Sequence, residues 1–256
     1  MAGKGMVLTE RDRAVLRDVA ELELVSRPQL QRRKHFGSRT RANAVLARLV
    51  RFGYLATRRQ PIVGGSRRVL YHLGPAGQEL LGIDSNGNLR GRRMKHLSDL
   101  FIEHHLRTND VRLGFWVAAH PQYSFDRWIT DAALRPLNLG LVPDGYVEYR
   151  HSGLNFAAFV ELDLGTETLG RWEAKTSGYL KLAYSGAFRN AFKHHYFRVL
   201  VITSSPGRLQ SLQRTIGRIT SKIFWLTTLD DVYREGPMGL IWHRPQDTTL
   251  HSLTEP

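Results

Sequence analysis

Apolar residues recur at helical spacing in three segments near the start of the chain. A hydroxyl residue that can cap a helix precedes each segment. The first cap also has the Thr-x-x-acid pattern of a capping box, and the second is followed by Pro at an early turn. The sequence therefore predicts three helices, which begin after Thr9, Ser26 and Ser38 and end near Leu22, Gly37 and Phe52.

Extended patterns replace the helical spacing after the third segment. Two runs, 54–60 and 68–73, flank Gly64-Gly65, whose tolerance of positive φ suits a tight hairpin. A short helix over 76–81 follows. Three helices with a hairpin predict a winged helix-turn-helix domain over residues 1–82.

The stretch 83–93 is rich in Asp, Ser, Asn and Gly and lacks apolar periodicity, which indicates a linker. Residues 94–256 then form the second domain. Its predicted order is α-β-β-β-α-β followed by further elements, and the whole chain is of the α/β (α+β) class. The expected helices cover 94–118, 166–183, 208–219 and 230–235, and the expected strands cover 123–129, 143–149, 154–164, 197–203, 222–226 and 238–242, the last at a sheet edge.

Positive charge is concentrated in the first domain. The chain has 37 Lys and Arg against 23 Asp and Glu, and residues 1–90 hold 17 of the former and 7 of the latter. Residues 27–68 contain 12 basic residues and no acidic one. Because a solvated surface usually mixes both signs, this window favours double-stranded DNA as partner. The alternative is a winged helix that contacts protein and carries arginine as a soluble face.

The first turn of the third helix holds the candidates for base recognition, because a helix-turn-helix inserts this end into the major groove. Arg pairs with guanine and Asn with adenine. Basic residues further along the helix and on the hairpin suit phosphate or minor-groove contact. The predicted DNA-binding residues are Arg39, Thr40, Arg41, Asn43, Arg48, Arg51, Arg58, Arg59, Arg67 and Arg68.

Three carboxylates gather around two predicted strands of the second domain. Asp144 begins one strand, and Glu161 and Asp163 project from one face near the end of the next. A buried carboxylate group needs compensation, and Mg²⁺ (or Mn²⁺) prefers such oxygens. We expect these three residues to hold the metal and, with Lys175, to form a catalytic site. The alternatives are a Pro-Asp-Gly turn, and a strand end whose acids pair with Arg171 or Lys175.

These motifs resemble the replication-relaxation family of plasmids and mobile elements, whose C-terminal part is similar to PD-(D/E)XK nucleases. The resemblance covers nearly the whole chain. It is carried by the winged helix and by 103–106 (EHHL), 143–145 (PDG), 160–167 (VELDLGTE) with Lys175 and Tyr179, and 198–208 (RVLVITSSPGR). It implies that Asp144 and Glu161 are the metal-binding carboxylates. It also implies a role in replication or relaxation of plasmid-like DNA.

One departure from the nuclease pattern leaves the activity open. Asp163 stands where the motif has Lys, so either Lys175 is a migrated substitute or the site is degenerate. The first hypothesis is a metal-dependent endonuclease or nickase targeted by the winged helix. The alternative is a non-catalytic replication accessory or transcription regulator, and a nuclease-like subunit that needs a partner is a third.

Several classes are disfavoured by what the sequence lacks. Cys is absent, which excludes disulfides and thiolate metal sites. There is no Gly-x-x-x-x-Gly-Lys loop for an ATPase, and adjacent His pairs are poor zinc chelates. No apolar run is long enough for a bilayer. We therefore expect a cytoplasmic protein, associated with nucleoid or plasmid and not with a membrane, that works as a homodimer or with other mobile-element proteins.

Overall fold

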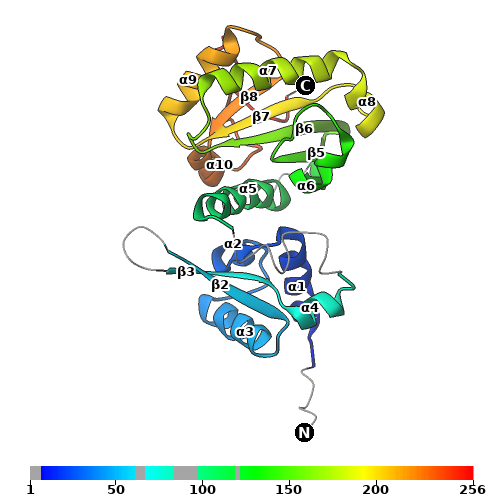
Figure 1. Ribbon diagram of the computed structural model, residues 1–256, viewed down its shortest axis with the longest axis vertical. Coiled ribbons are helices and arrows are strands. Elements are labelled where there is room, and N and C mark those ends of the chain that lie inside the picture. The colour runs from blue at the N-terminus through cyan, green and yellow to red at the C-terminus, as the bar shows by residue number, and fades with distance from the viewer. Residues whose placement is uncertain (1–6, 62–66, 84–96, 119–121, 256) are drawn as a thin grey trace. The chain divides into compact units, whose positions relative to one another are not determined.

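The computed structural model describes residues 7–61, 67–83, 97–118 and 122–255. The protein is a mixed α/β chain with two sheets, which confirms the predicted fold class (Figure 1). It divides into two compact units, Met1–Leu113 and Gly114–Pro256, and the division falls within helix α5 (Asp99–Val117). The predicted linker lies outside the described residues except for Ile83.

The N-terminal unit contains four helices before α5 and a small antiparallel sheet of order β1-β3-β2 in its described part. The helices are α1 (Glu10–Leu22), α2 (Arg27–Arg32), α3 (Arg39–Arg51) and α4 (Pro75–Leu80). The strands are β1 (Val25–Ser26), β2 (Leu55–Pro61) and β3 (Arg67–Leu73). The hairpin tip with Gly64-Gly65 lies outside the described residues.

The three predicted helix starts are confirmed. The hydroxyls of Thr9, Ser26 and Ser38 each accept a hydrogen bond from the backbone N–H three residues further on, at 3.2, 3.5 and 3.2 Å. The end predicted for the second helix is wrong, because α2 stops at Arg32. Lys34 has a φ of 59°, in the left-handed region, which ends the helix before Gly37. Strand β1 was not predicted, since two residues show no alternation.

The C-terminal unit is built on a seven-stranded sheet of order β10-β9-β8-β7-β6-β5-β4. Strands β4, β5 and β6 form an antiparallel meander, whereas β6, β7 and β8 run parallel. The strands are β4 (Tyr123–Thr130), β5 (Gly145–His151), β6 (Leu154–Asp163), β7 (Arg198–Thr203), β8 (Phe224–Thr228), β9 (Trp242–His243) and β10 (Leu250–His251).

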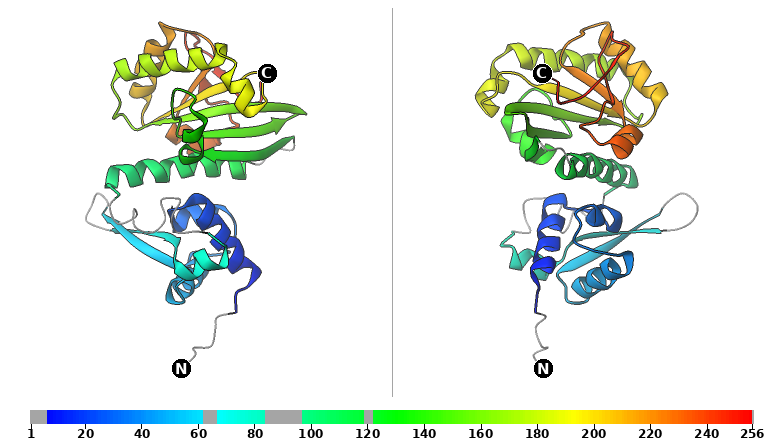
Figure 2. Two further views of the ribbon diagram at one scale, coloured as in Figure 1. Left: turned by 45° about the vertical axis from the view of Figure 1, so that its right-hand side comes forward. Right: turned by 180° about the vertical axis from the view of Figure 1, so that it is seen from behind.

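Helices connect the parallel strands and cover one face of the sheet. Helix α7 leads from β6 towards β7 and α9 from β7 to β8, and both lie on the same face (Figures 1 and 2). The helices of this unit after α5 are α6 (Asp131–Leu134), a 3₁₀ turn (Arg135–Leu137), α7 (Leu169–Tyr184), α8 (Ala187–Phe192), α9 (Pro206–Gly217) and α10 (Leu229–Glu235). None of the helices within the described residues is long and apolar enough to cross a membrane.

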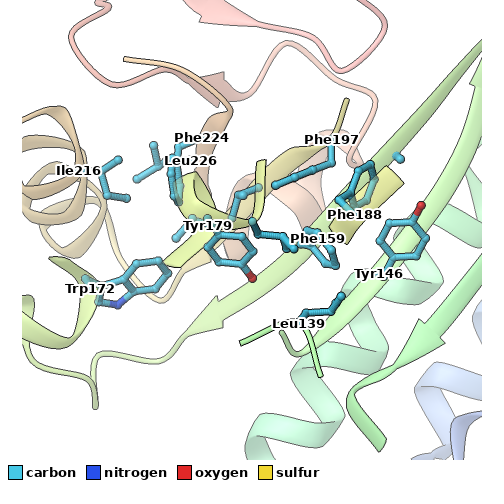
Figure 3. Close-up of a cluster of buried hydrophobic side chains, with 14 of the residues drawn as sticks. Leu139, Tyr146, Phe159, Trp172, Tyr179, Phe188, Phe197, Ile216, Phe224 and Leu226 are labelled. Atoms are coloured by element: carbon cyan, nitrogen blue, oxygen red, sulfur yellow. The ribbon is translucent and has the colours of Figure 1, made fainter. Parts of the chain in front are cut away.

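A core rich in aromatic side chains lies between the sheet and α7, α8 and α9 (Figure 3). Phe159 of β6 packs against Tyr179 of α7, with ring centroids 5.7 Å apart, and against Phe197. Since alternate residues of a strand share a face, Glu161 and Asp163 project to the same side as Phe159. The core thereby fixes the direction of both carboxylates.

Two expectations for this unit are wrong. Helix α7 begins at Leu169 and not at Thr166, because the hydroxyl of Thr168 is the cap and accepts from Arg171 N–H at 3.3 Å. The strand predicted over 238–242 is reduced to Trp242–His243, and β10 takes the edge position. The short helices α6 and α8 were not predicted, because fewer than two turns give no readable periodicity.

Candidate functional site

Glu161 lies at the centre of a buried polar cluster at the end of β6. Its side chain is almost fully buried, with 2% exposure. The Tyr179 hydroxyl donates to its Oε1 at 2.6 Å, and the Lys175 ammonium lies 2.8 Å from its Oε2. Tyr179 and Lys175 are four residues apart on α7, so one face of that helix holds both oxygens of this carboxylate.

Asp144 joins this cluster from the residue before β5. Its backbone N–H donates to Val160 O at 3.1 Å, and its Oδ2 accepts from the backbone N–H of Leu162 at 2.8 Å. These two bonds bracket Glu161 along β6. Burial, together with the nearby negative charge of Asp144, raises the pKa of Glu161 to about 7. Two carboxylates that repel each other are therefore held close together.

The residue after Asp144 is held by packing. A Cβ atom at Gly145 would lie 2.2 Å from the Trp128 ring of the neighbouring strand β4. Only glycine fits beneath this indole, which brings β5 against β4 directly beside the carboxylate.

Lys175 bridges two carboxylates. Besides Glu161, its ammonium contacts Glu167 at 2.9 Å. Burial acts to lower the pKa of Lys175, but these two carboxylates outweigh it and raise that pKa above its usual value. The ammonium also lies 4.9 Å from the ring centroid of Trp172. Lys175 is thus a positioned cation beside the acidic pair.

Asp163 belongs to a different network. Its Oδ1 accepts from Gly165 N–H at 2.6 Å and from Arg208 Nε at 3.0 Å, and its Oδ2 accepts from Arg208 Nη2 at 2.7 Å and from the Trp172 indole N–H at 2.5 Å. Despite burial, these donors hold the pKa of Asp163 below its usual value. The structure brings Asp144, Glu161 and Lys175 together and joins Asp163 to α9.

The donor set suits a Mg²⁺ ion held by few protein ligands. Among the described residues, no group of three or more His, Cys, Asp or Glu side chains is arranged to hold a metal. Asp144 and Glu161 form a pair, however, and Mg²⁺ is often bound by one or two carboxylates with water and substrate phosphate as the other ligands. Each Glu161 oxygen has one of the contacts described above and keeps a second lone pair for such an ion, whereas each Asp163 oxygen already accepts two hydrogen bonds.

The first turn of α3 presents four of the predicted DNA-contacting side chains. Arg39, Thr40, Arg41 and Asn43 are all exposed. Asn43 Oδ1 accepts from Arg27 Nη1 at 2.9 Å, which adds a further cation to this surface. At the end of the helix Arg51 is exposed.

Arg48 is directed into the fold. Its Nη2 donates to both carboxylate oxygens of Asp12, at 2.7 and 2.8 Å, and the Asp12 side chain is fully buried. Burial acts to raise the pKa of Asp12, but hydrogen bonds from Thr9 and the charge of Arg48 hold it below its usual value. This pair links α3 to the first turn of α1.

A groove of about 930 Å³ lies between the start of α3, the β2–β3 hairpin and the first turns of α5. Five arginines line it, together with Asp99 and Glu103. Arg68 donates to Glu103 Oε2 at 2.6 Å, and Arg107 donates to Oε1 at 2.7 Å. The arginines that line the groove are Arg27, Arg39, Arg67, Arg68 and Arg107. Its surface is cationic, with the Glu103 carboxylate between Arg68 and Arg107 and with Asp99 as a second acidic residue.

The two remaining hairpin arginines differ. Arg58 donates to Leu97 O at 2.7 Å and is half-buried, whereas Arg59 is exposed.

Sequence reasoning did not assign roles to Arg208 and Glu167. Arg208 follows the strand that ends at Thr203, and Ser205 caps the helix that carries it. A cation in the first turn of a helix is unusual, because the N-terminal end of the helix dipole disfavours positive charge. The unfavourable position of this arginine in the sequence could therefore have indicated that it has a carboxylate partner.

Comparison with protein families gives one match. The replication-relaxation family model matches residues 16–195, which include α3, the hairpin and the Asp144–Glu161–Lys175 cluster. No curated protein and no solved structure matched the chain. Since the matched region exceeds half of the chain, the protein belongs to the replication-relaxation family.

Proposed function

We propose that the chain binds double-stranded DNA in the replication or relaxation of a mobile element, through a winged-helix arrangement of α3 and the β2–β3 hairpin. The exposed residues at the first turn of α3 carry this proposal. They adjoin a groove lined by five arginines, four of which belong to the stretch from Arg27 to Arg68 that contains no acidic residue. A protruding helix end with flanking cations is the arrangement by which such domains read a major groove and its phosphates.

Arg39 and Arg41 are the side chains that test this surface. Fluorescence anisotropy with a labelled duplex should show weaker binding by Arg39→Ala and Arg41→Ala. The plot of log affinity against log salt should also become shallower, by about 0.9 for each phosphate that the variant no longer neutralises. Arg214→Ala on α9 is the matched control, since it removes one exposed arginine from the other unit. Equal affinity of all three variants with the wild type would refute DNA binding by this surface.

A second candidate function is metal-dependent cleavage of a phosphodiester bond at the C-terminal cluster. The juxtaposition of Asp144 and Glu161, which raises the pKa of the latter, is the observation that favours it. Such a pair costs folding stability, and a site for a cation explains why it is kept. When bound, Mg²⁺ stabilises negative charge on phosphate oxygens.

Each residue of the cluster has a defined part in this candidate function. Asp144 and Glu161 would hold a bound Mg²⁺ ion. Tyr179 orients Glu161 through its Oε1, and Glu167 helps to hold the Lys175 ammonium beside the pair. From there the ammonium donates to an oxygen of the phosphate. Asp163 stays with Arg208 and supports the strand end.

Nicking of a supercoiled plasmid in Mg²⁺ or Mn²⁺ tests this candidate. Asp144→Asn and Lys175→Met should abolish nicking while duplex affinity stays unchanged. Asp126→Asn removes an exposed carboxylate of β4 and should cleave as the wild type does. A wild type that binds duplex DNA but never nicks it supports the non-catalytic alternative. In that case the protein is a replication accessory or a transcription regulator, and its second unit does not cleave DNA.

A further inference from the structure

A concavity of about 490 Å³ in the C-terminal unit lies at the starts of β7 and β8. We propose that it binds a nucleotide, either free or as part of a single DNA strand. This inference extends the proposed function. It rests on that function where the nucleotide is part of a DNA strand. Its lining combines aromatic and cationic side chains, among them Phe156, Tyr196, Lys222, Trp225 and Arg244.

The pocket is distinct from the carboxylate cluster. Arg198 pairs in register with Ala158, three residues before Glu161 on β6, which is about 10 Å along the strand. An offset of three residues also places the two side chains on opposite faces of the sheet.

The charge of the pocket is positive. Arg198, Lys222 and Arg244 line it, and there is no Asp or Glu among the lining residues. Arg198 donates to Leu253 O at 2.7 Å, a neutral acceptor that leaves its charge uncompensated. Arg244 forms a long ion pair with Glu255, at 3.9 Å, which is beyond hydrogen-bonding distance and offsets its charge only in part. The pocket therefore offers positive charge to a phosphate.

Trp225 orders two of these cations. The guanidinium carbons of Arg198 and Arg244 lie 4.4 and 4.2 Å from its ring centroid. Arg198 also lies 4.8 Å from the Phe156 centroid. Stacking fixes the planes of the guanidinium groups. Both terminal nitrogens of Arg198 already donate, to the Tyr149 hydroxyl, Leu253 O and Glu255 O, so the donors to an anion come from Arg244 and Lys222.

Tyr196 supplies a surface for a base. It lines the pocket and is 88% exposed, in the residues directly before β7. A large aromatic ring left in water beside cations suits the stacking of a base whose phosphate binds nearby. An acidic peptide would use the cations but would have no need of the ring. The combination therefore favours a nucleotide.

Binding of a fluorescein-labelled oligothymidylate to the full-length chain tests the proposal. The chain carries Arg39→Ala and Arg41→Ala, so that the duplex-binding surface contributes little. Tyr196→Ala and Lys222→Ala are made in this background. Both positions are exposed, so neither change should disturb the fold. The matched controls are Tyr184→Ala and Lys181→Ala, an 81% exposed tyrosine and an exposed lysine, both on α7.

Tyr196→Ala should weaken oligothymidylate binding by at least about fivefold, as expected when one base is no longer stacked. Lys222→Ala should also weaken it, whereas the two controls should not. Thymidine 5′-monophosphate is the second probe. If this nucleotide competes with the oligothymidylate, a free nucleotide is sufficient for binding. If the oligothymidylate binds but the nucleotide does not compete, the pocket binds a nucleotide only as part of a DNA strand.

Equal oligothymidylate affinity of Tyr196→Ala and its background would overturn the pocket assignment. Binding of polyglutamate that depends on Lys222 but not on Tyr196 would overturn it in favour of an acidic peptide. Duplex affinity is measured separately on the wild type, so failure of the pocket and failure of the proposed duplex surface are distinguishable.

Discussion

The guanidinium of Arg208 donates two hydrogen bonds to the Asp163 carboxylate, from Nε at 3.0 Å and from Nη2 at 2.7 Å. Arg208 also donates to Glu167 O at 2.5 Å. One side chain of α9 thus fixes the end of β6 and the loop that leads to α7. Asp163, which the resemblance to the nuclease pattern placed at the Lys position, therefore takes part in a structural ion pair.

Removal of Arg208 should destabilise the C-terminal unit. Arg208→Ala leaves the buried Asp163 charge without its main partner, which costs about 3–5 kcal/mol. Urea unfolding followed by tryptophan fluorescence measures this, because the five tryptophans, from Trp116 to Trp242, all belong to that unit. Arg214→Ala on the same helix is the control and should change stability by no more than about 0.5 kcal/mol. Similar midpoints for both variants would show that the ion pair is dispensable.

The start of α7 should depend on Thr168 and not on Thr166. Loss of a hydroxyl cap costs about 0.5–2 kcal/mol, so Thr168→Ala should lower the free energy of unfolding by that amount. Thr166→Ala is the matched control, because it removes the same group two residues earlier, outside the helix. The same tryptophan fluorescence assay reports the result. A larger effect at Thr166 would contradict the observed cap.

The difference between these two threonines illustrates what sequence reasoning can and cannot locate. The pattern after β6 showed a glycine break and then helical spacing, so a helix was predicted correctly. Thr166 and Thr168 are equally good caps in isolation. The choice depends on where Trp172 packs, because its indole must reach Asp163. That contact joins elements whose relation no local pattern contains.

Arg48 should contribute to stability as the partner of Asp12. Asp12→Asn removes a carboxylate whose pKa is lower in the folded than in the unfolded chain. Such a group stabilises the fold above its unfolded pKa of about 3.9, and that stability disappears as pH falls through the folded pKa. The wild type should therefore exceed Asp12→Asn in stability near neutral pH, and the difference should shrink below about pH 4. Urea unfolding followed by far-ultraviolet circular dichroism measures this.

Arg48→Met provides the second half of this experiment. It leaves the buried carboxylate unpaired and should destabilise the N-terminal unit more than Asp12→Asn does near neutral pH. Arg51→Met removes an exposed arginine from the same helix and is the control. A difference between wild type and Asp12→Asn that stays constant with pH would contradict the ion pair.

Glu103 should weaken DNA binding by occupying Arg68. Its carboxylate accepts from Arg68 and Arg107 inside the cationic groove, where a phosphate would compete with it. Glu103→Gln should raise duplex affinity by about two- to fivefold, the range expected from one partly exposed ion pair. Fluorescence anisotropy at fixed salt measures the change.

Glu79→Gln controls for net charge. Glu79 is exposed on α4, so this variant changes the overall charge equally without touching the groove. If both variants gain affinity equally, the effect is one of general charge. If Glu103→Gln loses affinity, the carboxylate holds the hairpin in its binding position and does not compete with phosphate.

The candidate site was predictable in its acidic residues and in Lys175, but not in the way the acidic residues divide among their partners. Asp144 and Glu161 were found from a strand start and a strand end, because the ends of neighbouring strands meet. Glu161 and Asp163 are two residues apart on a strand, and this spacing correctly placed both side chains on one face of the sheet. Yet Lys175 reaches Glu161 while Arg208 reaches Asp163, so the two acids divide between two networks. Which cation pairs with which carboxylate depends on how the helices pack on the sheet.

The close fit of Trp128 against Gly145 has a consequence for the evolutionary history of this site. Any side chain at position 145 would displace the indole. Purifying selection should therefore preserve this glycine even in descendants that have lost the acidic pair. The carboxylate beside it has no such steric reason to persist. In an alignment of relatives, variation at Asp144 beside an invariant Gly145 would therefore mark lineages in which the proposed metal site was lost and the scaffold was kept.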